Sequence, residues 1–129
     1  MTNVIVLGHG GYGSAIQRNL GMLMGVAEHY HYIDFNETDD LEILREKIQK
    51  VLTEVGDDDV LFCCDLAGGS PFREAAMICV EHPNYSCVAG LNTSAYTEMT
   101  FNLDMTPAEL GTMACEVAKE SIMQFPPIQ

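Results

Sequence analysis

The sequence predicts an α/β protein, a three-layer sandwich in which helices cover both faces of a four-stranded, mainly parallel sheet. Two observations lead to this prediction. Short apolar runs alternate with segments of helical spacing along the 129 residues. The apolar runs are continuous rather than alternating, which is typical of parallel strands buried on both faces. The length fits a single domain, and we expect residues 1–129 to form one.

Apolar runs bounded by glycine or polar residues give the predicted strands, at residues 4–7, 29–35, 60–64 and 85–89. Apolar residues at helical spacing give the predicted helices, which cover residues 13–26, 39–55, 70–81, 94–103 and 106–123. Three helix starts carry capping residues, namely Asp39 with Glu42, Ser70 with Pro71, and Thr106 with Glu109. Ligand sites in open parallel sheets lie at the carboxyl ends of the strands, so the loops that follow the strands matter most.

The first of these loops, Gly8–Gly13, matches the pattern G-x-G-x-x-G, and Asp34 follows about twenty residues later. Glycines and an acid in this arrangement are typical of dinucleotide binding, so a Rossmann-like nucleotide-binding module is one hypothesis. Four parallel strands make only about half of a two-lobed dinucleotide fold, which weakens it.

His9 lies inside the same loop, after a strand and just before a helix N-terminus. Such a terminus disfavours a charged imidazolium and favours an anion. A neutral imidazole beside backbone N–H groups is therefore suited to accept a phosphoryl group. The alternative for a single loop histidine is a capping or space-filling role.

The loop after the third strand, Asp65–Phe72, supports the phosphoryl hypothesis. If the strand order is 2-1-3-4, Asp65 lies beside His9, where a carboxylate can fix the tautomer of the ring. Gly68, Gly69 and Ser70 then provide a second helix N-terminus near the same place. Taken singly, Asp65 could be a turn acid and the glycines a simple turn.

The composition limits the possible partners. A formal charge of −13 argues against nucleic acid and against an anionic membrane surface, and favours a basic partner. No run of about twenty apolar residues is present, and we expect neither a signal peptide nor membrane insertion. The five cysteines are interpreted as reduced core residues of a cytoplasmic protein. Cys63 and Cys64 are adjacent in a strand and point to opposite faces, which excludes a shared metal site.

Three segments together resemble the mannose-type enzyme IIA of the phosphoenolpyruvate-dependent sugar phosphotransferase system. They are Gly8-His9-Gly10, Asp65–Phe72 and Gly90-Leu91-Asn92, and the likeness covers essentially the whole chain. The resemblance implies a phosphotransferase without cofactor or metal. In it, His9 accepts phosphate from the histidine phosphocarrier protein and passes it to the IIB component. The membrane components IIC and IID are indirect partners in sugar uptake.

The resemblance also assigns roles to further residues. Asp65 would hydrogen-bond the His9 ring, and Gly10, Gly68, Gly69 and Ser70 would contact the phosphoryl group. We place Phe72, Arg73 and Asn92 on the partner surface. Arg73 stands where mannose enzymes usually carry Asn, which resembles the N-acetylgalactosamine branch. The dihydroxyacetone kinase phosphotransfer subunit is an alternative, although it usually lacks the Gly-Gly-Ser-Pro-Phe loop.

Family members are homodimers that exchange an antiparallel strand near the C-terminus. The resemblance therefore implies a dimer and an added edge strand. In this chain only residues 124–129 are free to form it, and Pro126 and Pro127 suit an edge strand poorly.

Overall fold

The computed structural model describes residues 1–128 and contains the expected four-stranded sheet. All neighbouring strands are parallel, in the order β2-β1-β3-β4. The strands are β1 (Thr2–His9), β2 (Tyr30–Phe35), β3 (Asp59–Cys64) and β4 (Tyr85–Ala89). The chain adds β2 on one side of β1 and β3 on the other, so the strand order reverses at the carboxyl ends of β1 and β3.

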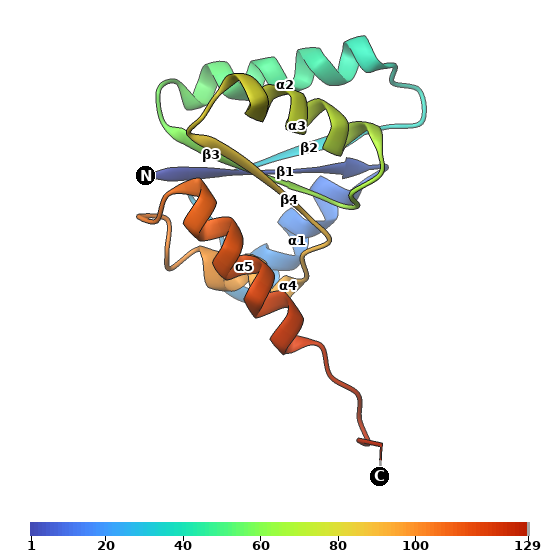
Figure 1. Ribbon diagram of the computed structural model, residues 1–129. Helices are drawn as coiled ribbons and strands as arrows, with labels where there is room; N and C mark the ends of the chain where they lie inside the picture. Colours follow the sequence, from blue (N-terminus) through green and yellow to red (C-terminus); the bar gives the residue numbers. More distant parts are fainter. Residues whose placement is uncertain (129) are drawn as a thin grey trace.

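Helices cover both faces of the sheet, as Figure 1 shows. One face carries α2 (Leu41–Val55) and α3 (Ser70–Glu81), and the other carries α1 (Tyr12–Met24), α4 (Thr93–Met99) and α5 (Pro107–Ser121). Neighbouring strand residues enter opposite cores, so Cys63 packs with the α1 side and Cys64 with the α2 side, which confirms the sequence prediction. Leu61 and Phe62 are fully buried, and each side chain of this size contributes about 2 kcal/mol by leaving water.

The start of α2 corrects the predicted cap. Asp40, not Asp39, is the N-cap, and its carboxylate accepts a hydrogen bond of 2.9 Å from the amide of Ile43. Asp39 instead accepts from the amide of Asn36 at 2.9 Å and from Lys47 at 2.6 Å. Two adjacent acids offer the same chemistry, so only the backbone conformation decides which one caps the helix.

Other element boundaries also shift. Gly69 is the N-cap of α3, so Ser70 is its first residue rather than its cap. The cap of α4 is Asn92, whose side chain accepts from the amide of Ala95, and the helix ends at Met99 instead of residue 103. The capping box of Thr106 with Glu109 is confirmed. Strand β1 runs on to His9, which therefore belongs to the sheet and not to the loop.

Within one chain, the described residues do not form the added antiparallel strand that the resemblance implies. Residues 122–128 form no strand, and in Figure 1 this tail leads away from the body beyond α5. Pro126 and Pro127 have no N–H group to give to a ladder. Residue 129 belongs to the segment expected to form this strand and lies outside the described residues. Within residues 1–128, no helix combines the length and apolar character that crossing a membrane requires.

Candidate functional site

The sheet brings His9 and Asp65 together, as the sequence predicts. His9 is the last residue of β1 and pairs with Phe35 of β2. On the other side of β1, Leu7 pairs with Cys64, so Asp65 leaves β3 beside the end of β1. The two residues meet because parallel strands end at the same edge of the sheet.

The carboxylate of Asp65 holds both the ring and the backbone of His9. Its Oδ2 atom lies 2.8 Å from Nδ1 of the ring and accepts from the His9 amide at 3.0 Å. Its Oδ1 atom accepts from the amide of Leu66 at 3.0 Å. The His9 side chain is 44% exposed and that of Asp65 only 14%. The ring therefore faces solvent while the group that orients it lies behind it.

These contacts determine which ring nitrogen is free. Burial alone raises the pKa of Asp65, but the hydrogen bonds from the His9 amide, the His9 ring and the Leu66 amide outweigh it and lower the pKa. An ionised carboxylate can only accept hydrogen bonds. Nδ1 must then carry the proton, which leaves the lone pair of Nε2 free to attack an electrophile.

Gly69 packs closely against the ring of His9. A Cβ atom at this position would overlap Cε1 and Nε2 of His9. Because Gly69 is also the N-cap of α3, Nε2 lies at the N-terminus of that helix. The unpaired amides of a helix N-terminus bind anions, so phosphoryl oxygens on Nε2 would meet N–H donors there. Gly68 is exposed and Ser70 is half-buried on either side of this contact.

Gly10 and Phe35 complete the surroundings of the ring. Gly10 has φ of +60°, and its amide donates to the carbonyl oxygen of Phe35 at 2.8 Å. Gly10 was predicted to contact the phosphoryl group, and its N–H is engaged within the chain. The Phe35 ring meets the His9 ring edge-on with centroids 5.9 Å apart. Sequence reasoning did not single out Phe35, although the strand register that places it beside His9 was a usable signal.

The three residues predicted for the partner surface have different environments. Arg73 is exposed in the first turn of α3, and Phe72 is half-buried against the α2 side of the core. The side chain of Asn92 acts within the chain, because Oδ1 caps α4 and Nδ2 donates to Ser121 at 2.9 Å. Arg73 is therefore the most accessible of the three.

Asp34 has a role that differs from the one the dinucleotide hypothesis needs. Its carboxylate accepts from the amide of Ser14 at 3.0 Å and from the Ser14 hydroxyl. Both oxygens are thus occupied at the start of α1. A ribose would have to displace these bonds, so the geometry does not favour nucleotide binding.

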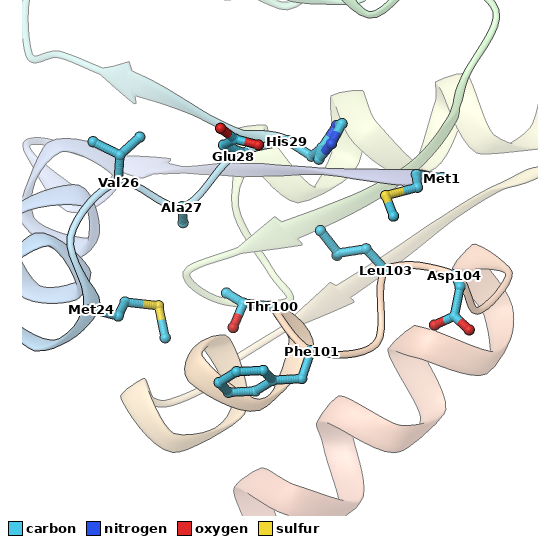
Figure 2. Close-up of a pocket in the computed structure, with 10 residues that line it drawn as sticks. All are labelled: Met1, Met24, Val26, Ala27, Glu28, His29, Thr100, Phe101, Leu103 and Asp104. Carbon is cyan, nitrogen blue, oxygen red and sulfur yellow. The ribbon is translucent and has the colours of Figure 1, made fainter.

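A cavity of about 700 Å³ lies at the opposite end of the sheet, as Figure 2 shows. Met1, Met24 and Phe101 are among its lining residues, and none of the residues near His9 belongs to it. Among residues 1–128, no group of three or more His, Cys, Asp or Glu side chains is arranged to hold a metal ion. The chemically distinctive site is therefore the His9–Asp65 pair.

Comparison with known proteins places the chain in a family. The EIIA-man family, described as "PTS system fructose IIA component", matches residues 3–108. The chain belongs to this family. The mannose-specific EIIAB component of the phosphotransferase system from Escherichia coli K12 is 34% identical over 126 residues. That alignment covers 95% of this chain but 39% of the relative, so the chain spans about two fifths of that protein.

Two further known proteins are similar to this chain over most of their length. The fructose-specific EIIA component of Bacillus subtilis is 29% identical over 100 residues, which are 77% of this chain and 68% of that protein. The mannose/sorbose-specific IIA subunit from Enterococcus faecalis superposes with a TM-score of 0.89 at 22% identity, covering 99% of this chain and 97% of that one. This structural likeness shows that the fold is shared.

Proposed function

We propose that this protein is a phosphoryl carrier of a sugar phosphotransferase system, with His9 as the residue that is phosphorylated. The observation that supports this most is the contact of 2.8 Å between Nδ1 of His9 and Asp65. It leaves Nε2 as the nucleophile, next to the N-terminus of α3. Membership of the EIIA-man family supports the same reaction.

The transfer balances without a further reactant. The lone pair of Nε2 attacks the phosphorus atom of a donor phosphohistidine, and the donor P–N bond breaks with its electrons returning to the donor imidazole. The proton on Nδ1 stays in its bond to Asp65 throughout. Backbone N–H groups around Gly68, Gly69 and Ser70 would bind the phosphoryl oxygens. In the second step, a nucleophile of the IIB component attacks the phosphorus atom, and the P–N bond to His9 breaks with its electrons returning to Nε2.

The finer parts of the proposal follow the resemblance. The donor is the basic histidine phosphocarrier protein, the acceptor is the IIB component, and the membrane components IIC and IID are indirect partners. We further propose that residues 1–129 act as one domain in a cytoplasmic homodimer. Phe72 and Arg73, at the start of α3, lie close enough in sequence to Gly69 to border the partner surface.

The decisive experiment is phosphorylation in solution. The protein is incubated with phosphoenolpyruvate, enzyme I and the phosphocarrier protein, and its intact mass is measured before and after mild acid. We expect one acid-labile phosphoryl group on the wild type and none on His9→Ala. His82→Ala is the matched control, because His82 is an exposed histidine at the other end of α3. Undiminished labelling of His9→Ala would show that the proposed site is wrong.

Molecular mass in solution tests the homodimer separately. Sedimentation of the full chain is compared with that of a chain ending at residue 121. A monomer at micromolar concentration for the full chain would contradict the proposed dimer without affecting the assignment of His9.

A further inference from the structure

Tyr12 lies beside Gly8, the residue that precedes His9, and Asp65 lies beside the same glycine. It is the first residue of α1, and its ring covers Gly8. A Cβ atom at Gly8 would lie 2.7 Å from Cδ2 of Tyr12 and 2.8 Å from Cγ of Asp65. The Tyr12 ring and the Asp65 carboxylate thus both lie beside Gly8, which precedes His9 in β1.

The hydroxyl of Tyr12 is anchored in the core on the α1 side. It lies 2.6 Å from the hydroxyl of Tyr96, a residue of α4 with no exposed surface. The carbonyl oxygen of Tyr96 in turn accepts from the hydroxyl of Tyr30 on β2 at 2.6 Å. A buried hydroxyl that loses its partner costs free energy, so Tyr96 strongly favours the observed position of Tyr12.

The hydroxyl pair keeps its protons over the whole neutral range. Burial raises the pKa of Tyr12 and the pKa of Tyr96 above the ordinary tyrosine value. One hydroxyl can therefore donate to the other at any pH at which the protein works. The anchor is a permanent part of the fold and not a titrating group.

We propose that Tyr12 is a positioning residue for phosphoryl transfer. Its ring, fixed by the hydroxyl bond to Tyr96, holds the carboxylate of Asp65 against the backbone and ring of His9. Neither tyrosine touches the reacting nitrogen, so both act through Asp65. This inference deepens the proposed function. Its prediction of the transfer rate rests on that function.

The test removes each hydroxyl while keeping each ring. The variants are Tyr12→Phe, Tyr96→Phe and the double variant, with Tyr32→Phe as the matched control. Tyr32 is a half-buried tyrosine of the same core cluster, on β2. Two quantities are measured, the pKa of Asp65 by carboxyl-carbon NMR and the rate of phosphoryl transfer from the phosphocarrier protein. Melting temperatures are recorded for all variants.

If the proposal is correct, Tyr12→Phe and Tyr96→Phe each raise the pKa of Asp65 towards its ordinary value. Each also slows transfer about tenfold, as is typical when a group that orients an active residue is lost. The double variant behaves like either single one, because both remove the same bond. Tyr32→Phe leaves both quantities unchanged even if its melting temperature falls.

The proposal is overturned if the pKa of Asp65 in Tyr12→Phe equals that of the wild type, or if the double variant shows the product of two independent losses. The NMR titration needs no phosphorylation. If the wild type is never phosphorylated, the proposed function fails, while the titration still decides whether Tyr12 positions Asp65.

Discussion

The two ends of the parallel sheet differ in a way that bears on how a site is recognised. At the carboxyl end, the His9 ring contacts Asp65 on one side and Gly69 on another. At the amino end lies an open cavity of about 700 Å³ around Met1 and Phe101 (Figure 2). Glu28, His29 and Asp104 also line this cavity, but among the described residues no ion pair joins them. We therefore place the proposed phosphoryl transfer at the hydrogen-bonded His9–Asp65 pair and not in the larger cavity.

Among variants that keep His9, the largest effect on phosphoryl transfer is expected from Asp65→Asn at the carboxyl end. The amide can donate to Nδ1, which moves the ring proton to Nε2 and blocks the nucleophile. We expect transfer to fall by about a hundredfold with the fold retained. Stopped-flow transfer from the phosphocarrier protein and circular dichroism measure the two quantities. Equal rates in variant and wild type would contradict the assigned role of Asp65.

Gly69→Ala should have the next largest effect. The new methyl group overlaps the His9 ring, which must tilt away from the N-terminus of α3. We expect transfer to slow by about tenfold, since small displacements of a reacting group are costly. Gly21→Ala is the control, because a Cβ in that part of α1 meets open space. That control should leave transfer unchanged and raise stability by about 0.5–1 kcal/mol.

A smaller effect is expected on the titration of Asp65 itself. Because bonds from His9 lower its pKa, His9→Ala should raise that pKa, although the backbone bond from residue 9 remains. A carboxyl with a lowered folded-state pKa contributes stability above the ordinary value of 3.8, and this contribution is lost as pH falls through the folded value. Carboxyl-carbon NMR measures the shift, and acid unfolding of His9→Ala should begin at a higher pH.

The smallest effect is expected at the amino end. Phe101 is 74% exposed beside the cavity, and Phe101→Ser should change transfer by less than about twofold. A large loss in this variant would mean that the two ends are coupled. The same phosphorylation assay measures it.

Much of the site could be predicted because topology alone brings its parts together. Continuous apolar runs gave the parallel strands, and the order β2-β1-β3-β4 then places Asp65 beside His9. Tyr12 could not be assigned in the same way, since its contacts depend on the side-chain direction of a helix residue. The choice between Asp39 and Asp40 as a cap likewise depends on backbone angles that two adjacent acids do not encode.

The position of His9 inside β1 has one further consequence. Central strands of a sheet usually open only when the whole domain unfolds, whereas surface loops fluctuate locally. The candidate phosphorylation residue ends the central strand β1, paired with β2, and its amide is tied to the residue that follows β3. The site should therefore not open by local unfolding. Loss of phosphoryl transfer on heating should coincide with global unfolding of the domain.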